Sequence, residues 1–343
     1  MTDLVKSAGQ GRHTSDRSPL AVMTSRQTRM LRTAMGEAIA AALEDPEVVE
    51  ILLNPDGALW FDRLDTGRRR SGICLSREDG DRIIRLVAAH LRLEVHPGAP
   101  IISAVLPETG ERFEGILPPI VRGPTFSIRK RTAGVIPLSK YVAEEILTED
   151  QALVLRDAVR ERKNILIAGG TSTGKTTLAN ALLLEIALTG DRVLMLEDTV
   201  ELQCRADDHV PLQTRRGLAS MADLVRSALR LRPDRIVVGE VRGGEALDLL
   251  KAWGTGHPGG IATIHAGSAR GALTRLEQLI QVVVVTVPSA LIAESVDLIV
   301  FLAGRGRARR VEELSWVTGF DAQGYHLEPA VSRSTSRRHG SRS

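Results

Sequence analysis

Apolar residues along this chain follow two different patterns, and the change falls near residue 150. In the first half, the stretch from Arg26 to Leu43 carries apolar side chains at helical spacing, which predicts one buried helix face. The segment VVEILLNPDGALWFDR predicts a strand, an Asn-Pro-Asp-Gly turn and a returning strand. A second helix is predicted from Asp79 to Leu91, and RFEGILPPIVRGPTFSIRK is typical of strands interrupted by prolines. We therefore expect a small α+β domain.

In the second half, short apolar runs alternate with helical patterns. Helices are predicted from Glu149 to Arg160 and from Thr176 to Ala187. The predicted strands are NILIAGG, RVLMLED, RIVVGEV, GIATIHA and VDLIVFLA. This alternation is typical of a buried, mostly parallel sheet, and it predicts an α/β domain.

The two patterns divide the chain into five predicted segments. They are an unstructured N-terminus at 1–25, an α+β domain at 26–131, a linker at 132–148, an α/β domain at 149–330 and a basic, unstructured tail at 331–343. The tail holds four arginines and no acid, and a solvated tail is its simpler interpretation. Attraction to anionic lipid or nucleic-acid phosphate is the alternative.

Composition narrows the classes of function. An apolar share of 43% with 25% charged residues is typical of a globular protein, while aromatic residues at 3% weaken the case for a base-stacking surface and leave direct nucleic-acid binding open. Cys74 and Cys204 lie far apart, which argues against a disulfide framework or a metal site and favours a reduced, cytosolic compartment. The most apolar segment, Leu279 to Val287, is too short to cross a bilayer, so membrane contact is expected to be peripheral.

The strongest chemical signal is GGTSTGKTT, which follows a predicted strand and opens a predicted helix. It matches the phosphate-loop pattern G-x-x-x-x-G-K-[ST], and its strand–helix setting makes a chance match in a glycine-rich chain the weaker interpretation. Lys175 is expected to reach the β- and γ-phosphates, and the Thr176 hydroxyl to bind Mg²⁺. The phosphate-binding residues predicted here are Gly169, Gly170, Thr171, Ser172, Thr173, Gly174, Lys175, Thr176 and Thr177.

Two strand ends supply the acids that such a site needs. RVLMLED places Glu197 and Asp198 just after a strand, and RIVVGEV does the same for Glu240. Ligands of open α/β sheets bind beyond the carboxyl ends of the strands, so catalytic acids are favoured over acids that merely end a strand. We expect Glu197 to polarise the attacking water and Glu240 to hold Mg²⁺ through a water molecule. Gly239 stands where many P-loop proteins carry an aspartate.

A histidine follows a third strand end. A lone histidine is most often structural, but His265 follows GIATI at the same predicted edge of the sheet, which favours a role at the γ-phosphate or in linking nucleotide state to a neighbouring strand. His257, in GTGHPGG, is the weaker candidate, and an ordinary loop role explains it equally well.

Taken together, GGTSTGKTT, LEDTVEL, RIVVGEVRGGEA and GHPGGIATIHAGSA resemble the boxes of the type II and type IV secretion ATPases. The stretch RPDRIVVGEVRGGEALDLLKAWGTGHPGG is most similar to the TrbB-type conjugal transfer ATPases. The resemblance spans roughly residues 26–325, and it implies a RecA-like ATP-hydrolysing domain with a smaller N-terminal domain. It also implies a homo-hexamer at the cytoplasmic face of the inner membrane, working with inner-membrane components of the apparatus.

The resemblance implies further arginine contacts. In such enzymes arginines of the N-terminal domain reach the phosphates, and the matching positions are Arg112 and Arg129, although Arg129 and its neighbour Lys130 could simply solvate a strand. Arg215 and Arg216 are open candidates for a subunit-interface pair. The chain lacks the cysteine tetrad and long N-terminal region of many type II enzymes, which favours the type IV or conjugation branch.

Three functions remain open at this point. The leading one is a motor that couples ATP hydrolysis to pilus assembly or to translocation of DNA or protein, with a type IV pilus or type II secretion motor as the near alternative. A RecA-type helicase or packaging ATPase would need basic or aromatic channel loops. A nucleotide-gated assembly factor without turnover is disfavoured by the intact Lys175, Glu197, Glu240 and His265.

Overall fold

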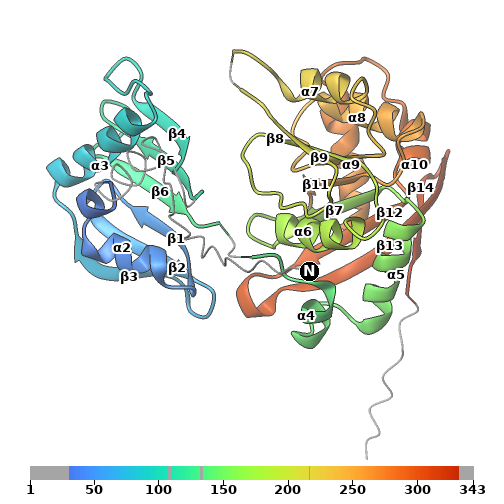
Figure 1. Cartoon of the computed structure of the whole chain (residues 1–343), viewed down its shortest axis with the longest axis horizontal. Helices are drawn as coiled ribbons and strands as arrows, with labels where there is room; N and C mark the ends of the chain where they lie inside the picture. Colours follow the sequence, from blue (N-terminus) through green and yellow to red (C-terminus); the bar gives the residue numbers. More distant parts are fainter. Residues whose placement is uncertain (1–30, 107–109, 132–133, 216, 332–343) are drawn as a thin grey trace, which may run out of the picture. The chain divides into compact units, whose positions relative to one another are not determined.

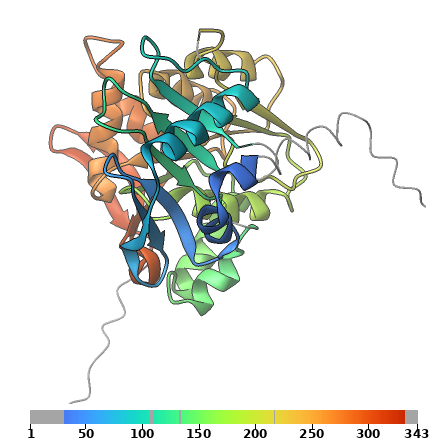
Figure 2. The same cartoon turned by 90° about the vertical axis from the view of Figure 1, so that its left-hand side faces the viewer.

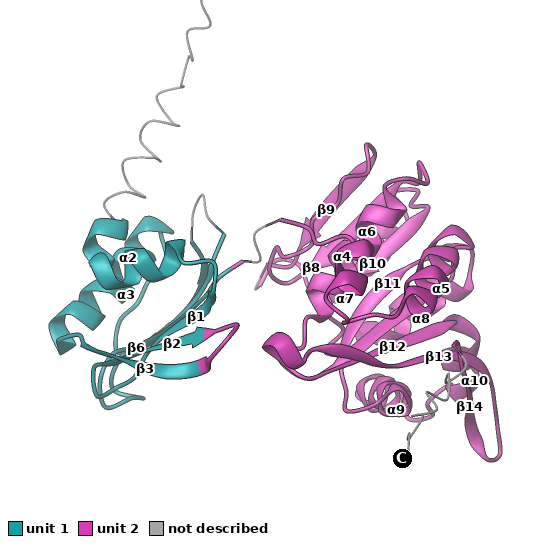
Figure 3. Cartoon of the chain, turned by 90° about the horizontal axis from the view of Figure 1, so that it is seen from below, with its two compact units in different colours: residues 1–62, 68–130 teal, residues 63–67, 131–343 magenta. Residues whose placement is uncertain are grey.

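The structure, a computed structural model, describes residues 31–106, 110–131, 134–215 and 217–331. The predicted segment 1–25, almost all of 331–343 and Arg216 lie outside the described residues. The chain forms two compact units, drawn in different colours in Figure 3. Unit 1 consists of Met1–Asp62 and Arg68–Lys130, and unit 2 of Arg63–Gly67 and Arg131–Ser343. None of the described helices is long and apolar enough to cross a membrane.

Unit 1 is a six-stranded sheet with helices on one side. Its strands, in the spatial order β3-β2-β1-β6-β5-β4, are β1 (Val48–Leu53), β2 (Ala58–Arg63), β3 (Gly67–Cys74), β4 (Ile101–Val105), β5 (Arg112–Ile116) and β6 (Thr125–Arg129). Helices α2 (Glu37–Glu44) and α3 (Arg77–His90) lie on the same side of this sheet (Figures 2 and 3). Their buried faces and one face of the strands form a single apolar core, with Ile39, Ile84 and Phe113 among its members.

The predicted α+β character of this half is confirmed, and so are the hairpin of β1 and β2 and the helix near Asp79–Leu91. The helical pattern predicted from Arg26 to Leu43 is confirmed in its described part, where Leu31, Met35 and Ile39 are buried, but it is interrupted at Gly36. Gly36 has a φ of +85°, which separates the helical residues 31–35 from α2. A left-handed residue breaks the helical hydrogen-bond pattern, whereas the apolar spacing continues across it and hides the break.

Unit 2 is built on an eight-stranded sheet in the order β14-β13-β12-β7-β11-β10-β8-β9. These strands are β7 (Ile165–Gly169), β8 (Val193–Glu197), β9 (His209–Gln213), β10 (Arg235–Val238), β11 (Ile261–His265), β12 (Leu298–Ala303), β13 (Arg310–Asp321) and β14 (Gly324–Pro329). The strands from β12 to β9 run parallel, while β13 and β14 add an antiparallel edge. The predicted mostly parallel sheet is confirmed.

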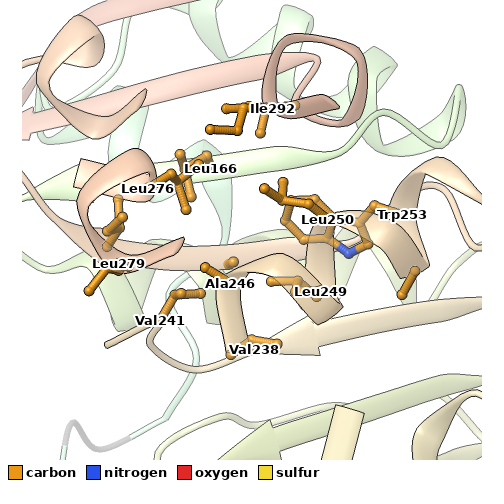
Figure 4. Packing of buried hydrophobic residues seen from close by; sticks show 14 of the residues in the cluster. Leu166, Val238, Val241, Ala246, Leu249, Leu250, Trp253, Leu276, Leu279 and Ile292 are labelled. Atoms are coloured by element: carbon orange, nitrogen blue, oxygen red, sulfur yellow. The ribbon is translucent and has the colours of Figure 1, made fainter. Parts of the chain in front are cut away.

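Helices cover both faces of this sheet (Figure 1). One face carries α4 (Leu138–Ala143), α5 (Glu149–Arg160) and α6 (Lys175–Ile186). The other carries α7 (Met221–Ala228), α8 (Glu245–Gly254), α9 (Ala269–Ile280) and α10 (Ser289–Ser295), whose core is drawn in Figure 4. Along β7, Leu166 belongs to the second core and Ile167 to the first, as the period of two in a strand requires.

The second core packs closely around Trp253, whose indole N–H donates to the carbonyl oxygen of Ile236 at 3.3 Å. A β-carbon on Gly260 would lie 2.0 Å from the indole nitrogen and 2.6 Å from that carbonyl oxygen. Gly260→Ala is therefore expected to displace the indole and lower the free energy of unfolding by about 2 kcal/mol or more. Chemical denaturation measures this, with Gly267→Ala as the matched control because its β-carbon meets no atom within 4 Å. Equal stability of the two variants would contradict this packing.

Candidate nucleotide-binding site

The phosphate loop leaves the carboxyl end of β7 and leads into α6. Gly169 ends the strand, and Gly174 caps the helix with a φ of +93°, a left-handed conformation that favours glycine. Ser172 also has a positive φ, of +63°. A β-carbon on Gly169 would lie 2.6 Å from the Thr173 hydroxyl oxygen and 2.7 Å from the carbonyl oxygen of Leu302. The strand–loop–helix geometry that the motif requires is present, with Thr176 and Thr177 in the first turn of α6.

Lys175 folds back over this loop. Its ammonium group donates to the carbonyl oxygens of Gly169 at 3.1 Å and Gly170 at 3.0 Å, and the residue is only 8% exposed. The first turn of α6 points its free backbone N–H groups toward the same place, because the first four N–H groups of a helix have no partner within it. The loop thus presents a held cation and a helix N-terminus, which together suit a phosphate group.

Glu197 is the last residue of β8. Although β9 comes between β8 and β10 along the chain, β8 and β10 are direct neighbours in the sheet. Its Oε1 accepts from the backbone N–H groups of Glu201 at 2.8 Å and Leu202 at 2.7 Å. A β-carbon on Gly239 would lie 3.1 Å from Cγ of Glu197 and 3.4 Å from Oε1. The Glu197 side chain therefore passes over Gly239, which explains why this strand end carries a glycine where an aspartate is common.

Burial raises the pKa of Glu197, and the two backbone N–H groups only partly offset that rise. The residue is 4% exposed, so its charged form lacks most of its hydration. A raised carboxyl pKa makes the group a stronger proton acceptor when it is ionised, which suits a general base.

Glu240, just beyond β10, lies between two nitrogen groups. Its Oε1 lies 2.9 Å from Nε2 of His265, the last residue of β11, and its Oε2 accepts from Nη2 of Arg242 at 2.6 Å. Arg242 also approaches Asp198, with 3.6 Å between Nη1 and Oδ2. The tertiary structure thus brings two of the predicted residues, Glu240 and His265, into direct contact.

The electrostatics of Glu240 are opposite to those of Glu197. Burial on its own raises the pKa of Glu240, but the hydrogen bond and charge of Arg242, with smaller contributions from His265 and Lys175, bring it below the usual value. The Glu240 carboxylate is therefore negatively charged at neutral pH, as is required of a group that binds a cation. Glu197 and Glu240 thus have environments that shift their pKa values in opposite directions, which is typical of two acids with different tasks.

Other predicted residues lie elsewhere. His257 is in the loop before β11, at the amino end of the strand, so it lies at the sheet edge opposite His265. Arg215 is exposed, in a bridge with Ala219 beyond β9. Arg112 and Arg129 belong to unit 1, where they face each other across β5 and β6.

Sequence reasoning missed Arg242, which pairs with both Glu240 and Asp198. Its position two residues after Glu240 was a usable signal. It also missed Asn180 of α6, which accepts from the backbone N–H of Gln203 at 2.8 Å and donates to the carbonyl oxygen of Glu201 at 3.0 Å. Asn180 thereby fixes the loop whose N–H groups hold Glu197, and only the fold shows this contact.

The phosphate loop and the neighbouring acid carry oxygen groups of the kind that Mg²⁺ takes as ligands. In the described parts of the chain, no group of three or more His, Cys, Asp or Glu side chains is arranged to hold a metal. A nucleotide-borne Mg²⁺ takes most of its ligands from phosphate oxygens and water, so one hydroxyl and one carboxylate are sufficient from the protein. Thr176 and Glu240 are of the right chemical types.

A phosphate loop after β7, acids after β8 and β10, and a histidine at the end of β11 all lie at the carboxyl edge of one sheet. This fold and this site define a P-loop nucleotide-binding protein with a RecA-like domain and a smaller N-terminal α+β domain. The sequence profile of the type II/IV secretion system proteins matches residues 81–305, and the chain belongs to this family of secretion ATPases.

Individual relatives agree with this membership. The chain is 48% identical to the conjugal transfer protein TrbB of Rhizobium radiobacter over 305 residues, which cover 88% of this chain and 94% of that protein. It is 34% identical to the type IV secretion system protein PtlH of Bordetella pertussis, with 83% and 95% covered. The structure of the Legionella pneumophila ATPase DotB matches with a TM-score of 0.58 at 19% identity, covers 88% of this chain and 82% of that one, and supports the fold alone.

Proposed function

We propose that this chain is the ATP-hydrolysing motor of a conjugal transfer or type IV secretion apparatus. The observation that carries the proposal is the site itself: a phosphate loop, two acids of opposite pKa shift and a histidine meet at one sheet edge. The 48% identity to a conjugal transfer protein over nearly its whole length supports the biological setting. Coupling to pilus assembly or to translocation of DNA or protein is the work that such a setting requires.

In the proposed mechanism, the loop from Gly169 to Thr177 holds the phosphates of ATP, and Lys175 neutralises the β- and γ-phosphate charge. Mg²⁺ enters as part of the MgATP substrate and is held by Thr176 and, through water, by Glu240. Glu197 orients and deprotonates the attacking water, and it needs to be ionised to do so. His265, paired with Glu240, responds to the γ-phosphate and passes the nucleotide state to β11 and its neighbours.

Arg112 and Arg129 are proposed to contact phosphate as well. They are directly opposite each other on β5 and β6, and Arg129 is opposite Glu50 on β1, so the cross-strand row carries two cations and one anion. Both arginines also interact with other groups of the protein, and a guanidinium group can donate two parallel hydrogen bonds to phosphate oxygens. This supports the assignment that the family resemblance suggested.

The proposed assembly is a ring of six copies, peripheral at the cytoplasmic face of the inner membrane and bound to membrane components of the apparatus. Domain closure on the γ-phosphate, released by hydrolysis, would supply the motion.

The experiment that tests the function is ATP hydrolysis measured over a range of protein concentrations, with light scattering for the particle mass. A secretion motor is expected to show turnover that rises with a six-subunit species and responds little to single-stranded DNA. Turnover by a monomer that never assembles would contradict the ring, and strong stimulation by single-stranded DNA would favour a helicase instead.

A further inference from the structure

The connection between β12 and β13 passes next to the phosphate loop. In the parallel register of β12 and β7, Leu302 is the partner of Gly169, the first glycine of the loop. The chain then turns tightly through Gly304, with a φ of +75°, and the short helix η1 (Gly306–Ala308) before β13 begins. A β-carbon on Gly304 would lie 2.0 Å from the carbonyl oxygen of Ala308, so this turn has one compact form. It places Arg309 beside α6.

The guanidinium of Arg309 lies directly against the end of the phosphate loop. A β-carbon on Gly174 would lie 2.9 Å from Cζ, 2.9 Å from Nε and 3.0 Å from Nη1 of Arg309. Gly174 is therefore a glycine for two reasons, its left-handed φ and the cation packed against it. Arg309 thus lies at the N-terminus of α6, against Gly174, the residue that precedes Lys175.

This is an unfavourable place for a cation. The N-terminus of a helix carries a partial positive charge, which favours anions and repels a guanidinium. Within the described residues, Arg309 forms no ion pair, and its Nε is buried without a hydrogen-bond partner. By contrast, the buried Arg235 is fully paired, with Nε on Asp191 at 2.6 Å and its other nitrogens on the carbonyl oxygens of Gly259 and Val159.

The charge of Arg309 also acts on a second buried polar group that has no hydrogen-bond partner among the described residues, the Tyr141 hydroxyl on α4. Burial raises the pKa of Tyr141, so its hydroxyl stays protonated and does not serve as the missing counter-ion. A buried donor without an acceptor is costly, so a bound group that supplies an acceptor at this place would lower the free energy of the folded protein.

We propose that Arg309 is a nucleotide-binding residue that contacts the α- and β-phosphates from the β12–β13 connection. A diphosphate at this place supplies an acceptor for Nε and counter-charge for Arg309, Lys175 and the α6 N-terminus at once. The β- and γ-phosphates are within reach of Lys175, whereas Gly174 lies at the end of the loop toward α6, where the loop backbone meets the α- and β-phosphates. The proposal rests on the proposed function and adds a binding group that lies outside residues 81–305, the part of the chain that the family profile matches.

The test is the affinity of the full chain for ADP and for a non-hydrolysable ATP analogue, measured by calorimetry on wild type and on Arg309→Gln. Because the α- and β-phosphates are common to both ligands, the dissociation constants of both are expected to rise by about tenfold or more. Arg309→Lys restores the charge but not the fork of donors, and is expected to recover part of the loss. Arg310→Gln is the matched control, because the Arg310 side chain is 57% exposed and pairs with Glu312.

Each other outcome overturns the proposal. A loss for the ATP analogue alone would assign Arg309 to the γ-phosphate, and no loss for either ligand would make it a structural residue. A structural role would also lower the melting temperature of the nucleotide-free protein, whereas the proposed role leaves it unchanged or higher. Lys175→Ala distinguishes a failure of this inference from a failure of the proposed function. If wild type and Arg309→Gln bind nucleotide equally and only Lys175→Ala does not bind, the Arg309 inference is wrong while the proposed function stands. If wild type binds no nucleotide, the proposed function is wrong.

Discussion

Replacement of Lys175 by alanine is expected to lower the rate of ATP hydrolysis by about 10²–10³-fold, with little effect on folding. The ammonium group is held by the carbonyl oxygens of Gly169 and Gly170, so it is already placed at the phosphate loop. Charge placed in advance needs no reorganisation as the transition state forms, which is why its loss is large. Alanine is a strong helix former, so α6 should begin at the same residue.

Phosphate release measured at saturating MgATP gives the rate, and thermal unfolding checks that the protein is folded. Lys251→Ala is the matched control, because Lys251 lies on the exposed side of α8. Hydrolysis by Lys175→Ala at more than about a tenth of the wild-type rate would show that the loop is not the catalytic site.

The second large effect is expected at Glu197. Glu197→Gln should lower hydrolysis by about 10²–10⁴-fold, because an amide does not accept the proton of the attacking water. ATP should still bind, since Glu197 is not a group of the phosphate loop. The amide oxygen still accepts from the backbone N–H groups of Glu201 and Leu202, so the local structure is retained.

The same variant should be more stable than wild type at neutral pH. Because burial raises the pKa of Glu197, the folded protein binds its proton more tightly than the unfolded chain does. Wild type therefore loses stability as the pH rises from the unfolded pKa, about 4.3, through the raised folded value. Glutamine does not titrate, so its advantage in melting temperature should be absent at low pH, grow through this window and then stay constant.

Glu240→Gln provides the contrast. Its folded pKa is lowered by Arg242 and His265, so the charged form stabilises the protein, and that contribution is lost as the pH falls through the lowered value. Loss of this charge should lower the melting temperature at neutral pH rather than raise it. If Glu240→Gln were the stabilised variant and Glu197→Gln the destabilised one, the division of roles proposed here would be reversed.

The elements that the sequence predicted well share one physical property. The strands β7, β8, β10, β11 and β12 are buried on both faces or nearly so, and each therefore appears as a continuous apolar run. The start of α5 is likewise determined locally, because the side chains of Thr148 and Gln151 each accept from the other's backbone N–H in a capping box.

The strands that were missed are mostly at sheet edges. β3 carries GRRRSGIC and has no buried residue, and β9 is a short edge strand that contains Pro211. Neither has the apolar alternation from which strands are predicted, because an edge or solvent-facing strand is held by backbone hydrogen bonds rather than by burial. The break at Gly36 was missed because apolar spacing alone does not reveal a left-handed residue.

The sequence by itself determined the phosphate loop, the acids after two strands, the histidine after a third and the family. These are local patterns, in which the spacing of residue types follows directly from the chemistry of a strand–loop–helix unit. Only the tertiary structure decided that Glu240 bonds both His265 and Arg242, that Glu197 crosses Gly239, and that Arg309 packs against Gly174. Those contacts depend on β8 lying beside β10, β10 beside β11 and β7 beside β12, and strand order is set by the packing of the whole sheet rather than by any one segment.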